Sequence, residues 1–166
     1  MCIRALTAMV ALVAIVSGAA APAAQPRPGT ARDRLVGTWH LVTYQILDPD
    51  GGPSRPGAYD VGRITYDPSG HMSAQLMHSS NKATQPPATD ADRAAAYRRY
   101  LGYFGPFTVD EAKSIVTHHV AGSSNPAWVG SNQVRHFAFS PDGNGLTLSL
   151  KSGERVTQSL YWERVK

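Results

Sequence analysis

The chain has 166 residues, of which 42% are hydrophobic, and its formal charge at pH 7 is +4. Its basic residues are scattered, and the longest run of them is the pair Arg98-Arg99. Because binding to nucleic acid needs a basic stripe or patch, we expect no nucleic-acid partner. The single cysteine lies at position 2, which excludes a framework of internal disulfides.

Residues 1–24 have the three-part pattern of a secretory signal peptide. A short basic start is followed by residues 5–16, which are apolar apart from Thr7, and then by residues 17–24, which are small apart from Pro22. An apolar core of this length is shorter than the roughly 20 residues that a membrane-spanning helix needs. The pattern predicts a signal peptide over residues 1–24 and a secreted or periplasmic protein with no stable membrane span after its removal.

Residues 25–34 contain Pro-Arg-Pro-Gly and are predicted to be a flexible leader, so that the folded domain covers residues 35–166. Within this domain, runs rich in β-branched and aromatic residues alternate with turn sequences such as Asp67-Pro-Ser-Gly. The predicted strands are 35–47, 61–66, 71–78, 104–109, 114–121, 133–139, 146–150 and 156–165. Short turns between them make consecutive strands antiparallel neighbours.

The connection from residue 79 to residue 102 is the one long exception. Its second half predicts a helix that begins at Thr89 or Asp90 as the N-cap residue. Four apolar or aromatic residues are spaced to share one face, namely Tyr97, Tyr100, Leu101 and Phe104. Two interpretations are open: an amphipathic helix that packs on the sheet, or a lid over an open end of the β structure.

An antiparallel meander of eight strands removes its exposed edges by closing on itself. The predicted fold is therefore all-β, an eight-stranded antiparallel up-and-down barrel with one helical insertion after the third strand. The interior of a barrel of this size is either filled by side chains or holds one small ligand.

Several motifs occur in the order found in one known family. Leu35-Val-Gly-Thr-Trp39 opens the first strand, and 64–77, 116–120 and 128–135 carry further family-like segments. With these motifs the chain resembles the bacterial and fungal lipocalin-like domain family, which are small calycin-type β-barrels. The resemblance implies a barrel with an internal pocket. It also implies that Arg164, in the last strand, lies over Trp39.

Strand alternation decides which side chains face the barrel interior. Successive side chains of a strand point to opposite faces, so His118 and His119 cannot both face inward. Phe137 belongs inside, and the alternation takes Gln133 and Arg135 inside with it. We assign His119 to the same interior; the alternative, in which His118 faces inward, stays open.

An inward arginine must be paired when it is buried. One interpretation is an internal network in which Arg135 contacts groups such as Gln75 or Tyr66. The other is that Arg135, Gln133 and His119 form the polar end of a pocket and bind a carboxylate, carbonyl or enol oxygen.

The remaining candidates are wall or lid residues. Trp128 plugs one barrel end or covers the mouth of a pocket, and Gln75 lines the pocket unless the apolar side chains beside it face inward. The full set of predicted ligand-binding residues is His119, Gln133, Arg135, Tyr66, Trp128, Phe137, Gln75, Tyr97 and Tyr100, with Trp39 as a further wall residue.

The sequence specifies no catalytic residue, metal site or cofactor. The six histidines do not show the spacing of a zinc site, and no Gly-x-Ser-x-Gly elbow or phosphate-binding glycine loop occurs. The preferred hypothesis is a secreted or periplasmic barrel that binds a small, mostly hydrophobic molecule with one polar end. The alternatives are an isomerase or cyclase acting in the same pocket, with a histidine or tyrosine as its acid–base group, and a packed barrel without a ligand. Neither the ligand's identity nor the oligomeric state is set by any motif.

Overall fold

The computed structural model describes residues 29–48, 50–81, 86 and 88–166. In chain order the strands are β1 (Gly37–Ile46), β2 (Arg55–Pro56), β3 (Val61–Tyr66), β4 (His71–Met77), β5 (Tyr100–Asp110), β6 (Ile115–His119), β7 (Gly122–Ser123), β8 (Asn132–Phe139), β9 (Gly145–Ser152) and β10 (Arg155–Arg164). The helices are α1 (Ala31–Leu35) and α2 (Asp90–Arg98), with 3₁₀ turns at Ser79–Asn81 and Pro126–Trp128. The predicted signal peptide, 1–24, lies outside the described residues.

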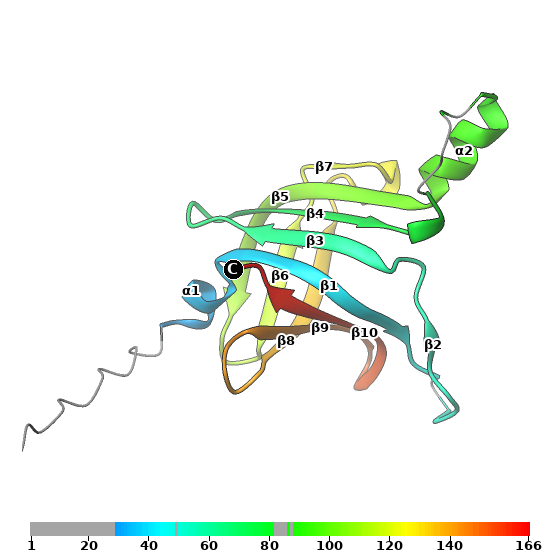
Figure 1. The fold of residues 1–166 in the computed structure, drawn as a ribbon. Coiled ribbons are helices and arrows are strands. Elements are labelled where there is room, and N and C mark those ends of the chain that lie inside the picture. Colours follow the sequence, from blue (N-terminus) through cyan, green and yellow to red (C-terminus); the bar gives the residue numbers. More distant parts are fainter. Residues whose placement is uncertain (1–28, 49, 82–85, 87) are drawn as a thin grey trace, which may run out of the picture.

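The eight long strands form one closed antiparallel barrel, as the sequence predicts (Figure 1). Each pairs with its neighbour in the order β1, β3, β4, β5, β6, β8, β9 and β10, and β10 pairs again with β1. The closing register sets Trp39 opposite Arg164. Because β10 pairs with β1, the first and last strands of the sheet cover each other's edges. The prediction of an eight-stranded up-and-down barrel is confirmed.

Alternation along β4 shows how the strands divide their side chains between the two faces of the barrel wall. Met72, Ala74 and Leu76 are buried in the interior, whereas Gln75 between them is exposed. The same period of two runs along β5, where Tyr103 and Phe107 are buried. The barrel interior is therefore the hydrophobic core, and what it leaves empty is space for a ligand.

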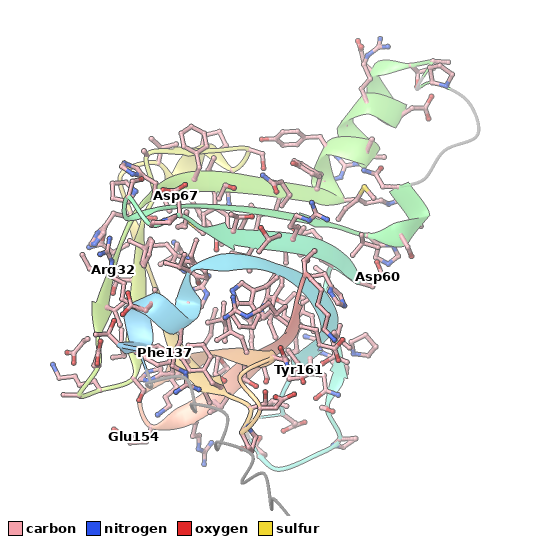
Figure 2. The ribbon with its side chains drawn as sticks, turned by 60° about the vertical axis from the view of Figure 1, so that its left-hand side comes forward. Arg32, Asp60, Asp67, Phe137, Glu154 and Tyr161 are labelled. Atoms are coloured by element: carbon pink, nitrogen blue, oxygen red, sulfur yellow. The ribbon has the colours of Figure 1, made fainter. Side chains whose placement is uncertain are left out.

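A short helix begins near the start of the described residues, where the sequence predicts a flexible leader up to residue 34. In α1, Thr30 accepts a hydrogen bond from the Asp33 amide, and the Asp33 carboxylate accepts one from the Thr30 amide, which is a complete capping box. Arg32 donates to the Pro68 carbonyl in the β3–β4 turn at 3.1 Å, and Figure 2 shows it beside Asp67 of that turn. These contacts correct the prediction for residues 31–34; residues 25–28 lie outside the described residues.

One end of the barrel is closed by α1 and the arginine of β10. Trp39 is fully buried, and its Nε1 donates to the Leu35 carbonyl at 2.9 Å. The Arg164 guanidinium lies 4.1 Å from the centre of the Trp39 ring and donates to the carbonyls of Val36 at 2.9 Å and Arg34 at 2.6 Å. The position that the family resemblance implies for Arg164 is thus confirmed. We call this arrangement of α1, Trp39 and Arg164 the closed end.

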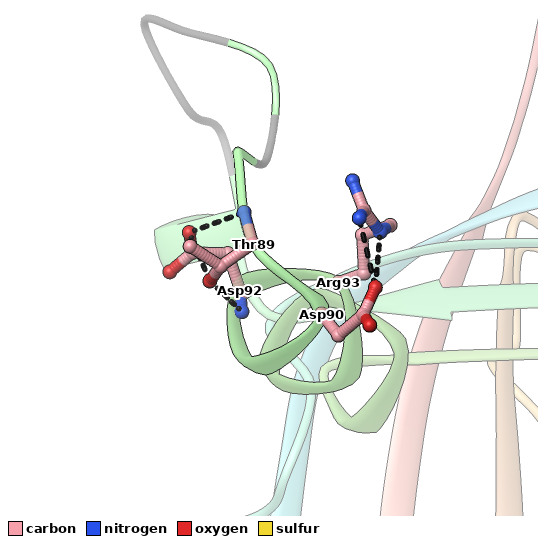
Figure 3. A network of polar contacts seen from close by, with 4 residues as sticks. All are labelled: Thr89, Asp90, Asp92 and Arg93. Atoms are coloured by element: carbon pink, nitrogen blue, oxygen red, sulfur yellow. Dashed lines mark hydrogen bonds and ion pairs between the residues drawn. The ribbon is translucent and has the colours of Figure 1, made fainter.

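The helical insertion follows the third long strand, as predicted, and begins with Thr89 as its N-cap. Thr89 and Asp92 form a capping box, and Arg93 pairs with Asp90 at 2.8 Å (Figure 3). No residue of α2 is buried, and the helix extends beyond the end of the sheet (Figure 1).

The helix is too short to include all four residues of the predicted apolar face. It ends at Arg98, and β5 begins at Tyr100, so the residues from Tyr100 onward alternate instead of sharing a helical face. Phe104 is 58% exposed for this reason, although the sequence pattern placed it with Tyr100 and Leu101. Strand pairing between β4 and β5 outweighs the local helical pattern here.

Candidate functional site

A cavity of about 470 Å³ lies within the barrel, at the end away from α1. Its deep wall consists of buried apolar side chains, including Ile64, Ala74 and Leu148, together with Trp162. Its outer wall includes Tyr97, from the last turn of α2. A volume of this size lies within the range typical of small-molecule sites, roughly 300–1,000 Å³.

Arg135 is the charged group on the wall of this cavity that lies deepest, with 8% of its surface exposed. It extends from β8, on the face that the alternation predicts. Its Nη1 donates to the Val134 carbonyl at 2.8 Å and its Nη2 to Gln133 Oε1 at 3.4 Å, a long contact. Among the residues that the structure describes, no carboxylate lies within ion-pair distance of this guanidinium.

His118 is fully buried beside Arg135 and bridges two tyrosines. Its Nε2 lies 2.8 Å from the Tyr66 hydroxyl and its Nδ1 lies 3.1 Å from the Tyr103 hydroxyl. Tyr66 and Tyr103 are buried as well, and Tyr103 lines the cavity. We call Tyr66, His118 and Tyr103 the tyrosine–histidine cluster.

The prediction that His119 faces the interior is wrong. In the β6–β8 ladder His118 lies opposite Gln133, and directly paired residues of an antiparallel ladder point to the same face. The inward position of Gln133 therefore takes His118 with it and turns His119 to the outer face. There His119 is hydrogen-bonded to Thr108 Oγ1 at 2.9 Å and to Asn132 Oδ1 at 2.7 Å.

Burial controls the ionisation of the cluster. It lowers the pKa of His118 to about 3, and the positive charge of Arg135 acts in the same direction. Burial also raises the pKa of Tyr66 and of Tyr103, although the charge of Arg135 opposes both shifts. At neutral pH the cluster is thus an uncharged hydrogen-bonded group next to a single cation.

Tyr97, Tyr100 and Trp128 line the cavity, as the sequence analysis proposed for wall or lid residues. Trp128 belongs to the 3₁₀ turn after β7, and its ring packs edge-on against Tyr103 at 5.3 Å between ring centres. Tyr97 and Tyr100 remain 53% and 39% exposed, so they stand at the rim of the cavity.

Of the other predicted residues, Gln75, Phe137, Tyr66, Gln133 and Trp39 do not line the cavity. Gln133 contacts Arg135 and the Ser131 hydroxyl, and Trp39 belongs to the closed end. Gln75 is exposed on the outer face of β4, so its assignment to the pocket is wrong; the apolar residues beside it took the inner face. Phe137 faces inward but packs against Phe139, with 5.5 Å between ring centres. Tyr66 reaches the site only through His118.

Sequence reasoning missed most of the residues on the cavity wall, among them the aromatic residues Tyr44, Tyr59, Tyr103 and Trp162. Tyr103 lies just before the predicted strand 104–109, because β5 begins at Tyr100, four residues earlier than expected; recognising Tyr100–Tyr103 as strand would have placed it inside. Trp162 stands in β10, two residues before Arg164. Its Nε1 is buried and has no hydrogen-bond partner among the described residues.

In the described ranges, no three His, Cys, Asp or Glu side chains come together in a way that could hold a metal ion. Nor do these ranges contain a helix with the length and apolar character needed to cross a membrane.

The sequence model of the lipocalin-like domain family matches residues 36–165. The chain is 38% identical over 74 residues to the 4'-hydroxy-3'-methoxypropiophenone carrier protein of Aspergillus oryzae (strain ATCC 42149 / RIB 40). The match covers 39% of this chain and 67% of that protein. Among solved structures, a redesigned β-barrel is similar with a TM-score of 0.42 and 11% identity, over 82% of this chain and 96% of that one.

Proposed function

The chain belongs to the lipocalin-like domain family, and from that premise we propose that its barrel binds and carries a small, mostly hydrophobic molecule with one polar end. The single observation that carries the proposal is the cavity of about 470 Å³ in which the buried Arg135 has no carboxylate partner among the described residues. A packed barrel without a ligand would leave no space of this size next to a buried cation.

The wall of the cavity indicates the shape of the molecule. Aromatic rings of Tyr44, Tyr59, Tyr103 and Trp128 stand on it together with aliphatic side chains, so a flat ring system would find apolar surface on several sides. A ligand placed there would bring its polar end to Arg135, because burying a polar group costs free energy unless it is hydrogen-bonded.

The similar fungal protein supports the same class of ligand. Its name describes the carrier of an aromatic ketone that bears a phenol and a methoxy group. We propose that the ligand of the present barrel is likewise a small aromatic molecule with oxygen substituents, and that transport or storage rather than turnover is its fate.

An isomerase or cyclase would need a group that exchanges a proton near neutral pH. In the tyrosine–histidine cluster, burial lowers the pKa of His118 to about 3 and raises the pKa of Tyr103. These directions favour a fixed hydrogen-bonding wall over an acid–base catalyst, so binding is the function that we propose.

We also propose that the protein works outside the cytoplasm, after removal of residues 1–24. The support is the basic, apolar and small-residue pattern of that segment. The intact mass of protein recovered from the culture medium or periplasm of its own host tests this. We expect a chain that lacks the segment; a full-length chain retained in the cytoplasm would contradict it.

The binding proposal is tested by filling the cavity. Ala74 is buried on the cavity wall, and its neighbour Gln75 is exposed on the outer face of the same strand. We expect Ala74→Trp to weaken binding of the neutral dye Nile red at least about tenfold, a difference of roughly 1.4 kcal/mol. Gln75→Trp, the matched control, should leave the affinity unchanged. Dye fluorescence measures both.

A second variant keeps the proposal testable if Ala74→Trp does not fold. Ala58 is an exposed residue at the rim of the cavity, so Ala58→Trp narrows the entrance without crowding the core. It should slow or weaken dye uptake while the thermal unfolding midpoint stays the same. Dye binding that is equal in all four proteins would contradict the proposal. Native mass spectrometry of protein from its own host then identifies the molecule it carries.

A further inference from the structure

The hydrogen-bond directions within the tyrosine–histidine cluster follow from counting protons. Neutral His118 has one N–H group and one lone pair, so it donates to one tyrosine and accepts from the other. Tyr66 is buried, and His118 Nε2 is its hydroxyl's one hydrogen-bond partner among the described residues. If Nε2 carried the proton, the Tyr66 hydroxyl hydrogen would have no acceptor, at a cost of about 1–3 kcal/mol. Tyr66 therefore donates to Nε2, and Nδ1–H donates to the Tyr103 oxygen.

This direction leaves the proton of Tyr103 available to the cavity. The Tyr103 hydroxyl receives a hydrogen bond from His118, and Arg135, its other polar neighbour, can only donate. Within the described part of the chain no acceptor for the Tyr103 proton is found. Because Tyr103 lines the cavity and is buried, an acceptor on the ligand would complete its hydrogen bonding.

Other polar groups on the cavity wall are also hydrogen-bond donors. The charged side chains on it are Arg98 and Arg135, and its described residues include no Asp or Glu. The buried Nε1–H of Trp162 is a further donor without a partner in the described ranges.

Two side-chain oxygens on the wall, by contrast, already accept a hydrogen bond from the protein. Gln158 Oε1 accepts from the Tyr44 hydroxyl at 2.6 Å, and Ser124 Oγ accepts from the Gly102 amide at 3.0 Å. A neutral hydroxyl or amine brought by a ligand would add a donor to a wall that already has an excess of them.

We propose that the barrel binds its ligand as an anion, with a deprotonated oxygen of an aromatic or enone framework held by Arg135 and by a hydrogen bond donated from Tyr103. The inference rests on the proposed function and names the form of the ligand that the site selects: a phenolate or enolate. The two terminal nitrogens of Arg135 already donate to Val134 and Gln133. The guanidinium has five N–H donors, so donors remain for a ligand oxygen, and the Tyr103 hydroxyl adds one more. A single-oxygen anion can accept from both residues at once. His118 and Tyr66 are positioning residues, because they fix the direction of the Tyr103 proton.

The test uses three probes of similar size with the purified full chain. They are 4-nitrophenol, whose anion absorbs at longer wavelength than its neutral form, 4-nitroanisole, which cannot ionise, and 4-nitrobenzoate, a carboxylate. We expect the absorbance titration of bound 4-nitrophenol to show a pKa at least about one unit below that of the free probe, which corresponds to binding of the anion about tenfold more tightly than the neutral form. The affinity for 4-nitroanisole should match that of neutral 4-nitrophenol.

Variants assign the effect to residues. Arg135→Gln should abolish the shift in the pKa of bound 4-nitrophenol, and Tyr103→Phe should reduce the affinity for the anion about 10- to 150-fold, the range for one hydrogen bond to a charged group. Both should lower the affinity for 4-nitroanisole much less than the affinity for the anion, a result that a general loss of packing would not give. His118→Gln should reduce the shift through Tyr103, whereas the outward His119→Gln, its matched control, should leave it unchanged.

The outcomes separate the inference from the function beneath it. An unshifted pKa with equal affinity for 4-nitrophenol and 4-nitroanisole would overturn the inference, and so would uptake of Nile red without binding of any nitro compound; both leave the carrier function standing. Tighter binding of 4-nitrobenzoate than of 4-nitrophenolate would overturn the choice of a single-oxygen anion. If neither Nile red nor the nitro compounds bind, both proposals fail.

Discussion

At each end of the barrel an arginine lies near a buried tryptophan, Arg164 with Trp39 and Arg135 with Trp162, and the donors of the two pairs are used differently. At the closed end, Arg164 covers the Trp39 ring and donates to two backbone carbonyls, while Trp39 Nε1 donates to a third. At the cavity, Arg135 donates to one carbonyl and makes one long contact to Gln133, and Trp162 Nε1 has no partner in the described ranges.

The comparison shows what distinguishes a structural polar group from one available to a ligand. The side chains are of the same type at both ends and both tryptophans are buried, but at the closed end their donors are satisfied by the chain's own backbone. At the cavity, donors remain. The difference lies in α1, which brings the carbonyls of Arg34 and Leu35 onto the closed end. In the described residues no helix carbonyl accepts a hydrogen bond from Arg135 or from Trp162 Nε1.

The largest effect that tests this comparison is on stability at the closed end. Trp39→Ala removes a fully buried ring that fills the space beneath α1, and we expect it to reduce the free energy of unfolding by about 3–5 kcal/mol. Trp128→Ala, at the cavity, removes a partly exposed ring and should cost less than half as much. Denaturant unfolding measures both; equal losses would mean that the cavity end is packed like the closed end.

A smaller effect concerns pH and distinguishes the cluster from the rest of the interior. The pKa of His118 is lowered from 6.5 to about 3 in the folded protein, so between these values the unfolded chain binds more protons. The free energy of unfolding should therefore fall as the pH drops below about 6.5, by up to about 1.4 kcal/mol per unit from this residue.

The matched variants isolate that slope. His118→Gln removes the titrating group and should flatten the pH dependence between pH 6 and pH 4, while His119→Gln should keep it. Below this window the aspartates with lowered pKa, such as Asp60 and Asp142, contribute in all three proteins, because their stabilisation is lost as they become protonated. A slope that persists unchanged in His118→Gln would show that His118 is charged in the folded state.

The smallest effect compares the two arginines directly. Arg164→Met leaves two carbonyls without their charged donor and should destabilise the fold by about 1.5–3 kcal/mol. Arg135→Met replaces a buried cation that lacks a carboxylate by an apolar side chain, so stability should change by no more than about 1 kcal/mol in either direction. Thermal and denaturant unfolding of the ligand-free variants provide the measurement. The reverse ranking would show that Arg135 is a structural group.

Much of this architecture can be predicted from the sequence, because it depends on local patterns. The eight strands follow from runs of β-favouring residues between turns, and closure follows from the need to remove sheet edges. The inward direction of Arg135 follows from its spacing to Phe137, since residues two apart on a strand share a face. The cap at Thr89 is local in the same way, because it involves side chains three residues apart.

The centre of the site was decided only in three dimensions. Alternation states that His118 and His119 point to opposite faces, and the register with β8 is what assigns His118 to the interior. In the same way, pairing with β4 extended β5 back to Tyr100 and turned Tyr103 into the cavity. The sequence by itself determined the strands, the barrel and the inward arginine, because these depend on neighbours along the chain. The tyrosine–histidine cluster depends on which residues of distant strands lie opposite one another, and only the tertiary structure sets that register.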